Sequence, residues 1–522
     1  MRNQKNKNSH TTWIGDKLPE CLIHKIFSCL SYEEAANSSL LSKTWLEAWS
    51  TQPNLKFKVE YGKGNNNNRK RMDKIMERYR ERKSPIDKFA LYISSSTYHH
   101  VLAFPRIDKW LDIALQNGVK DVVCKVSVPS YPFPISTFLA SKSLRELVLT
   151  GCDIMSLSLS TSTSDQLVKC HSLRRLSLCD VRLDDNILQT LVNCCPLLVD
   201  LKIQNCSLLT KIELRNLENI KSVYITTSYI DHISSVEIQA PTLEHLSYFG
   251  SCIAFDIIEC QNLKSLELSD MAISEGFLEC LISTSQNLER LILYFVSGEL
   301  HERFNICRSQ SLKVLAIQDC EDIGEIDASN LVSLEIVGSE IPELNIAKVS
   351  NQLKNSQIDL RCYNNLINAE WFCKLRIFLS NLTTWSQVSL HFDDCNEINM
   401  KDLQLHHSIA IPQVFVLNVD MRFINDVKSC PNFVDALLWS CHPRRLNLFS
   451  TIETITCFMD RLMYMKNSSH STYDGSALCH SQLKEVKAYK FISEHEHVEV
   501  DRQELAMMTQ IEMDAIFFLL DR

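Results

Sequence analysis

Aliphatic residues recur along the middle of the chain in the order aliphatic, two variable positions, aliphatic, one variable position, aliphatic. The clearest copies begin at Leu144, Leu173, Leu198, Ile220, Leu243, Leu263, Leu288, Leu312 and Leu331. Successive copies start between 19 residues apart (312 to 331) and 29 residues apart (144 to 173). The alternation at the end of each copy predicts one short strand, half buried and half facing outward.

This period and pattern are typical of leucine-rich repeats. Each repeat buries its apolar side only against its neighbours, so we expect one continuous curved solenoid of α/β class. Weaker copies follow at 388–392, from Val414 and from Pro443, and an earlier one begins at Val119. Before that copy, apolar residues at helical spacing from Ile107 predict a helix that ends near Gly118.

A small side chain often stands three residues after the third aliphatic position of a copy. These residues are Cys152, Cys206, Ser228, Ser251, Cys320 and Ser339. In such repeats this position faces inward and bonds to the backbone where the chain turns. A stacked inner ladder therefore explains part of the 21 cysteines better than a metal or redox site does.

The first fifty residues have a different pattern, which predicts three short helices. Apolar residues from Leu22 to Leu30 form a wide helical stripe after Pro19, and Ser31 with Glu34 has capping-box spacing for a second helix. Trp45 and Trp49 are four residues apart and would share one face of a third helix. So small a core predicts that a partner protein covers some of these apolar groups.

Composition and motifs restrict the function further. The net charge is −9, only 11 glycines are present, and no phosphate-binding loop, CxxC pair or catalytic serine motif occurs. We therefore expect no enzyme activity, no cofactor and no metal. With no apolar signal segment at the start and no apolar stretch of membrane-spanning length, we expect reduced cysteines, no membrane association, and a place in the nucleus, the cytoplasm or both.

The first block resembles a plant-type F-box. The matching residues are Leu18, Pro19, Leu22, Ile26, Leu30, Leu40, Leu41, Ser42, Lys43, Trp45 and Trp49. Thr44 departs from the pattern, because many members carry Arg there. The rest of the chain resembles plant F-box/leucine-rich-repeat proteins, and the segments 437–448 and 483–491 are similar to their FBD-type ends.

This resemblance implies a substrate-recognition subunit of an SCF-type cullin-RING ubiquitin ligase. Its F-box would dock a Skp-type adaptor, and through it the cullin and RING subunits, while the repeats hold an unknown target protein. The adaptor-binding residues would be Leu18, Pro19, Leu22, Ile26, Leu30, Leu41, Trp45 and Trp49. We expect Leu18, Pro19, Ile26 and Trp45 to lie on the exposed face of the F-box.

The expected organisation has five parts. A disordered tail at 1–13 precedes the F-box at 14–53, and a polar, basic linker follows at 54–84. The repeats occupy 85–440, and an FBD-like region at 441–522 continues them. The basic stretch at 65–83 is compatible with nuclear localisation or nucleic-acid binding, but a polar hinge followed by a solvated helix is favoured.

Two alternatives to a simple substrate receptor remain open at this point. One is a co-receptor that a small molecule gates, and the other is a repeat protein outside any ligase, including one that binds nucleic acid. On the strand face that the nine clear copies present, three basic and four acidic residues stand. A phosphate backbone would select a basic stripe, so nucleic acid is disfavoured as a partner.

Large side chains gather on the outward positions of the fourth to seventh copies. They are Tyr224, His245, Phe249, Ile292 and Tyr294. Exposed aromatic side chains of this kind are typical of protein interfaces, so they form the predicted target-binding site. Two other interpretations stay open: the rings serve only as good strand formers, or a register shift of one residue buries them.

Overall fold

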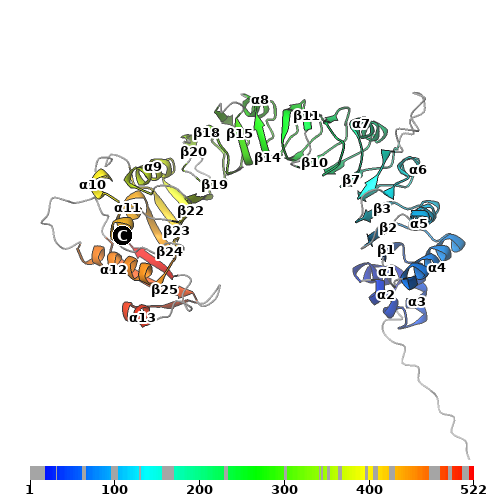
Figure 1. Cartoon of the computed structure of the whole chain (residues 1–522), viewed down its shortest axis with the longest axis horizontal. Coiled ribbons are helices and arrows are strands. Elements are labelled where there is room, and N and C mark those ends of the chain that lie inside the picture. The colour runs from blue at the N-terminus through cyan, green and yellow to red at the C-terminus, as the bar shows by residue number, and fades with distance from the viewer. Residues whose placement is uncertain are drawn as a thin grey trace, which may run out of the picture. The chain divides into compact units, whose positions relative to one another are not determined.

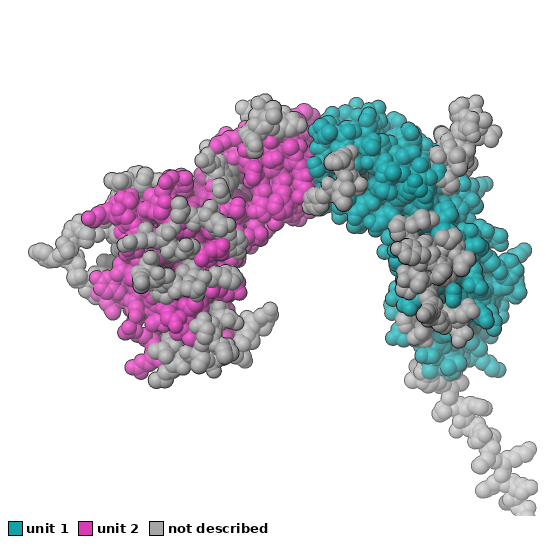
Figure 2. All heavy atoms as spheres, in the orientation of Figure 1, with its two compact units in different colours: residues 1–260 teal, residues 261–522 magenta. Residues whose placement is uncertain are grey.

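The computed structural model divides the chain into two units, residues 1–260 and residues 261–522 (Figure 2). The structure describes residues 18–30, 32–61, 66–95, 104–127, 131–155, 170–228, 233–274, 276–298, 303–339, 341, 345–349, 353–362, 367–393, 398–403, 410–422, 430–468, 483–491, 497–507 and 516–521. The expected tail at 1–13 and the capping residue Ser31 lie outside these residues.

The first unit begins with three short helices, as the sequence pattern predicts. They are α1 (Glu20–Cys29), α2 (Tyr32–Ser38) and α3 (Lys43–Ser50). Their core consists of Ile23, Phe27, Ala35, Trp45 and Ala48. The rings of Phe27 and Trp45 meet edge to face with centroids 5.5 Å apart. Ser42 caps α3, since its hydroxyl accepts the backbone N–H of Trp45 at 3.4 Å.

A parallel sheet follows in the first unit, with one strand from each repeat (Figure 1). Its strands, in spatial order, are β1 (Asn54–Tyr61), β2 (Lys88–Ser95), β3 (Asp121–Val126), β5 (Glu146–Thr150), β7 (Arg175–Cys179), β8 (Asp200–Gln204), β10 (Ser222–Thr226) and β12 (His245–Phe249). The predicted register holds, because the repeat aliphatics such as Leu147, Leu176 and Leu246 are buried and the residues between them face outward.

The other side of these repeats consists of helices and short strands. The helices are α4 (Asn66–Arg82), α5 (Phe104–Gln116), α6 (Ile135–Leu139) and α7 (Asp185–Cys194). The strands are β4 (Tyr131–Pro132) with β6 (Cys152–Asp153), and β9 (Lys211–Leu214), β11 (Ile233–Gln239) and β13 (Cys252–Ile258) in a second parallel sheet. Each repeat is therefore a coil with a buried apolar interior, which is the leucine-rich-repeat arrangement.

The second unit repeats this plan. Its parallel strands are β14 (Ser265–Ile273), β15 (Arg290–Gly298), β17 (Val314–Gln318), β19 (Ser333–Gly338), β21 (Asn355–Cys362), β22 (Thr384–Phe392), β23 (Gln413–Asp420) and β24 (His442–Phe449). A smaller parallel sheet holds β16 (Phe304–Ser309), β18 (Ile323–Ala328) and β20 (Asn345–Val349). The helices are α8 (Phe277–Thr284), α9 (Ala369–Leu379), α10 (Met400–Leu403), α11 (Cys430–Ser440), α12 (Ile452–Ser468) and α13 (Arg502–Met507). The weaker sequence copies are thus confirmed as strands β22, β23 and β24.

The expected linker at 54–84 is wrong. Its first part is strand β1, which pairs with β2 in the sheet. Its second part is α4, whose buried residues Met72, Ile75, Met76 and Tyr79 show that the helix packs rather than standing in solvent. Basic residues dominate the sequence of α4, and they hid the apolar spacing on its inner side.

The parallel arrangement continues into the expected FBD-like region at 441–522 as far as β24, and the strands after β24 pair antiparallel. Strand β27 (Ile516–Asp521) pairs antiparallel with β24 on one side and with β25 (Glu485–Phe491) on the other. Strand β26 (His497–Glu499) pairs antiparallel with β25 and has an exposed side-chain row. An antiparallel closure of this kind covers the edge of β24, which would otherwise leave its backbone groups unpaired.

The inner ladder is confirmed for three cysteines. The thiol of Cys206 donates to the carbonyl of Leu178 at 3.5 Å, that of Cys320 to Leu293 at 3.4 Å, and that of Cys152 to Thr150 at 3.6 Å. Burial raises the pKa of Cys206 to about 12 and that of Cys320 to about 11, so both stay protonated donors at neutral pH.

Two serines were wrongly placed in the ladder. Ser251 and Ser339 are exposed. In the fifth copy the inward position falls one residue later, where Cys252 is buried. The spacing between strand and turn differs between repeats, so a fixed offset from the third aliphatic residue misses some inward side chains.

Candidate functional site

Helix α1 presents apolar side chains on two adjacent sides, one buried and one exposed. Ile23 and Phe27 point into the three-helix core and are almost fully buried. Leu22 and Ile26 lie one residue away from them along the helix and are 46% and 38% exposed. Because residues four apart share a helix face, Leu22 and Ile26 form one exposed apolar strip.

The segment before α3 and the helix itself add further exposed leucines. Leu40, Leu41 and Leu46 are 82%, 52% and 49% exposed. Of the 14 large apolar residues that are exposed in the described part of the chain, five belong to these helices and their connections. We call Leu22, Ile26, Leu40, Leu41 and Leu46 the F-box apolar surface. Exposed apolar groups at this density are typical of interaction sites.

The predicted adaptor residues divide between this surface and the core. Pro19, Leu22, Ile26 and Leu41 are exposed, whereas Leu18, Leu30 and Trp49 are partly buried and pack against the helical core. The expectation that Trp45 lies on the exposed face is wrong, because Trp45 is 6% exposed and belongs to the core. Leu40 and Leu46 were missed as site candidates, although Leu40 stands within the F-box pattern itself.

In the first unit, part of the predicted target site forms a compact aromatic pair. The rings of Tyr224 and Phe249 lie with their centroids 5.4 Å apart on the outward face of β10 and β12. The ammonium group of Lys202 stands 4.7 Å from the centre of the Tyr224 ring. Both rings are half-buried and His245 is exposed, so the predicted register is correct for these three residues.

In the second unit, the prediction is right for one residue and wrong for another. Tyr294 is half-buried on β15, and burial is the main cause that raises its pKa. Ile292 is only 2% exposed, so the expectation that it is an outward contact residue is wrong. Glu267 and Ala316 lie directly opposite Ile292 on the two neighbouring strands.

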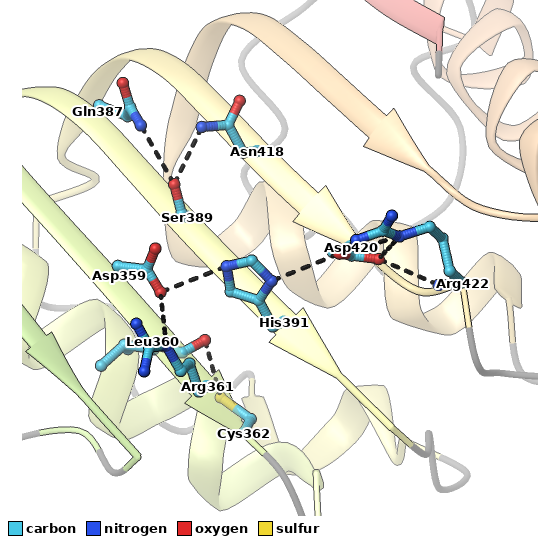
Figure 3. Close-up of polar contacts among 10 residues, drawn as sticks. All are labelled: Asp359, Leu360, Arg361, Cys362, Gln387, Ser389, His391, Asn418, Asp420 and Arg422. Atoms are coloured by element: carbon cyan, nitrogen blue, oxygen red, sulfur yellow. Dashed lines mark hydrogen bonds and ion pairs between the residues drawn. The ribbon is translucent and has the colours of Figure 1, made fainter. Parts of the chain in front are cut away.

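A charged cluster that the sequence did not reveal occupies the outward face of β21, β22 and β23 (Figure 3). His391 lies between two carboxylates: its Nε2 is 3.3 Å from Asp359 and its Nδ1 is 3.5 Å from Asp420. Arg361 stands 3.9 Å from Asp359, and Arg422 forms a 2.6 Å ion pair with Asp420. The hydrogen bond to Asp359 and the charges of both carboxylates raise the pKa of His391 against the opposing effect of its burial.

Beside this cluster a chain of polar side chains runs across the three strands β22, β23 and β24. Arg445 donates to Asn447 at 2.8 Å, Asn447 donates to Asn418 at 2.7 Å, and Asn418 donates to Ser389 at 2.9 Å. Gln387 donates to the same Ser389 hydroxyl at 3.3 Å, as Figure 3 shows. In the sequence these residues stand at the variable positions of the weak repeat copies, and no other feature of the sequence pointed to them.

The comparisons with known proteins agree with this architecture. The family described as At1g61320/AtMIF1, LRR domain, matches residues 81–258 and 251–515, and the F-box domain matches residues 16–57. The chain belongs to the plant F-box/leucine-rich-repeat proteins. Both the F-box helices and the repeat sheets described above are thereby assigned to known domains.

Relatives of this F-box/leucine-rich-repeat chain occur in Arabidopsis thaliana. It is 24% identical over 289 residues to F-box/LRR-repeat protein At3g03360, an alignment that covers 53% of this chain and 58% of the relative. It is also 24% identical over 318 residues to F-box/FBD/LRR-repeat protein At1g13570, covering 58% of this chain and 72% of that protein. The chain spans about half the length of the curated relatives it matches first.

Metal sites and membrane-spanning helices were also considered from the sequence, and the described residues of this F-box/leucine-rich-repeat chain can be checked for both. No group of three or more His, Cys, Asp or Glu side chains there is arranged to hold a metal ion. His497 of the HEHVEVD segment packs its ring 5.4 Å from Phe517, and His495 lies outside the described residues. Across the described helices, none combines the length and the apolar character that a membrane crossing requires.

Proposed function

We propose that this chain is the substrate-recognition subunit of an SCF-type cullin-RING ubiquitin ligase. The observation that supports this most strongly is the F-box apolar surface, which places Leu22 and Ile26 in solvent while a core of only five residues holds the helices together. A three-helix domain this small gains from a partner that covers such side chains. The partner we propose is a Skp-type adaptor, which links the chain to the cullin and RING subunits.

We propose that the repeats hold a target protein. Two surfaces are candidates: the Tyr224–Phe249 pair with His245 in the first unit, and the His391 cluster with its polar neighbours in the second. Aromatic and charged side chains that are already held in place by neighbours cost little entropy on binding, which favours recognition. Tyr294 remains a candidate contact residue.

We propose that the chain itself is not an enzyme and that other subunits transfer ubiquitin. The ladder cysteines support this, because burial keeps thiols such as Cys206 and Cys320 protonated and far from the reactivity that a ubiquitin thioester needs. Their role as S–H donors also requires reduced thiols, which supports a place in the cytoplasm, the nucleus or both.

The proposal is tested by affinity purification from the native tissue with the proteasome inhibited, followed by mass spectrometry. Two variants are compared with the wild type. The Leu22→Ser, Ile26→Ser variant should lose adaptor, cullin and RING subunit but keep the target. The Tyr224→Ala, Phe249→Ala, Tyr294→Ala variant should keep the ligase subunits and lose the target.

Two outcomes would contradict the proposal. If the Leu22→Ser, Ile26→Ser variant recovers as much of the ligase subunits as the wild type does, the F-box apolar surface does not bind the adaptor. A triple variant that loses the target together with its melting temperature would show that the three rings belong to the core rather than to a binding face.

A further inference from the structure

A cavity of about 380 Å³ lies in the first unit where the F-box meets the start of the repeat sheet. Three parts of the chain line it: Phe27 and Trp49 from the F-box, Tyr79 from α4, and Leu55 and Tyr92 from β1 and β2. Its volume falls within the usual range for small-molecule sites, and its walls combine aromatic and aliphatic side chains with polar and basic ones.

The charges around this cavity all have one sign. Lys56, Arg78 and Lys88 line it, and none of the described residues that line it is Asp or Glu. The chain as a whole has a net charge of −9, so this local excess of positive charge runs against the general composition. Low-dielectric walls strengthen the field of such charges and attract an anion.

Arg78 carries a second indication of a ligand. Its guanidinium lies over the Trp49 ring at 4.8 Å and near the Tyr79 ring at 5.6 Å, which fixes it at the cavity wall. Its Nε atom is buried and has no hydrogen-bond partner among the described residues. A buried donor of this kind is costly unless an acceptor reaches it, and a bound anion would supply one.

We propose that this cavity binds a small amphipathic anion, an aromatic or aliphatic molecule with a carboxylate, sulfonate or phosphate group. The apolar part would lie against Trp49, Tyr79 and Tyr92, and the anionic group would meet Arg78 and the two lysines. Such a ligand would contact the F-box, α4 and the sheet together, and so stabilise the junction between them. This proposal does not depend on the adaptor-binding function of the F-box.

The test is isothermal titration calorimetry on the full chain with 2-naphthoate as the anionic probe and 2-naphthamide as its uncharged counterpart. We expect saturable binding of 2-naphthoate and binding of 2-naphthamide that is at least about tenfold weaker. Added salt should weaken the binding of 2-naphthoate, because the charges at the cavity mouth are screened.

Matched variants on one strand locate the site. Lys56→Gln and Lys58→Gln remove the same charge from exposed positions of β1, but only Lys56 lines the cavity. Lys56→Gln and Arg78→Gln should each weaken 2-naphthoate binding by about tenfold, and Lys58→Gln should change it by less than about twofold. If Arg78→Gln disturbs the packing on Trp49, the comparison of Lys56→Gln with Lys58→Gln still tests the site, because it does not involve Arg78.

Three results would overturn the proposal. They are no saturable binding of 2-naphthoate, equal binding of the charged and uncharged probes, and equal effects of Lys56→Gln and Lys58→Gln. Since the adaptor takes no part in this measurement, none of these results bears on the ligase function.

Discussion

Neighbouring residues of one F-box helix have opposite environments. Ile23 and Phe27 are buried, whereas Leu22 and Ile26, each one position earlier, are in solvent. Hydrophobicity alone does not separate the two pairs, since all four are large apolar residues. Helix geometry does, because the side that packs on Trp45 is fixed by the position of α3.

Trp45→Ala should unfold the F-box rather than remove an adaptor contact. Truncation of a buried Trp costs about 3–5 kcal/mol, which is large for a core of five residues. We expect rapid proteolysis within residues 18–50 of this variant, while Leu46→Ala on the exposed side stays resistant. A Trp45→Ala chain as resistant as the wild type would place Trp45 outside the core.

His391 should bind its proton more tightly than an ordinary histidine. Because the pKa of His391 is raised in the folded state, its interaction with Asp359 and Asp420 stabilises the fold. This stabilisation is complete below about pH 6.5, the pKa of His in the unfolded chain, and is lost as the pH rises through the pKa of the folded state. Histidine NMR titration, with the resonance assigned by its absence in His391→Gln, should give a midpoint above about 6.5.

Asp359→Asn provides the control for that titration. Removing this carboxylate takes away the largest cause of the shift, so the His391 midpoint should fall towards the ordinary value, while Arg361 and Arg422 stay in place. A midpoint at or below about 6.5 in the wild type would contradict the ion pairs seen in Figure 3.

At the scale of elements, the strand that closes the second unit comes from the end of the chain. Strand β27 lies between β24 and β25 and pairs antiparallel with both. Its consecutive residues Phe518 and Leu519 differ sharply, since Phe518 is fully buried and Leu519 is 40% exposed. Ile516, Phe518 and Leu520 form one buried face of this six-residue strand, and on the other face only Phe517 is buried.

Phe518→Ala should destabilise the second unit by about 3–5 kcal/mol, and Leu519→Ala should have less than about a quarter of that effect. Thermal unfolding monitored by hydrogen exchange in β24 and β25 distinguishes the two variants. Faster exchange in both strands is expected for Phe518→Ala. Equal exchange in the two variants would show that β27 does not hold these strands.

The elements also show what sequence patterns could and could not predict. Repeats with regular aliphatic spacing, such as those from Leu144 to Leu331, fixed strand positions and register correctly. The helix α4 was expected in this stretch, but its packing was missed because its lysines and arginines mask the inward Met72, Ile75 and Tyr79. The His391 cluster was missed because its members come from three repeats whose partners are brought together only by register.

At the scale of the whole molecule, the proposed docking surface and the proposed recognition surfaces belong to different parts of the chain. The F-box apolar surface lies within residues 18–50, and the candidate target faces lie on repeat strands in both units. The residues that we propose for adaptor binding, such as Leu22 and Ile26, are therefore different from the strand residues that we propose for target binding. The account then requires that adaptor binding and target capture can be lost independently.

The most direct test of this account is the affinity of the purified chain for a Skp-type adaptor, measured by calorimetry. Buried apolar anchors at an interface typically cost at least about 2 kcal/mol each when truncated, or about 4 kcal/mol for the pair, so Leu22→Ser, Ile26→Ser should weaken binding by roughly 700-fold or more. Lys25→Ser, an exposed polar position of the same helix, should change it by less than about threefold. If the double variant binds the adaptor as tightly as the wild type while its melting temperature is unchanged, the F-box apolar surface is not the docking site and the central claim fails.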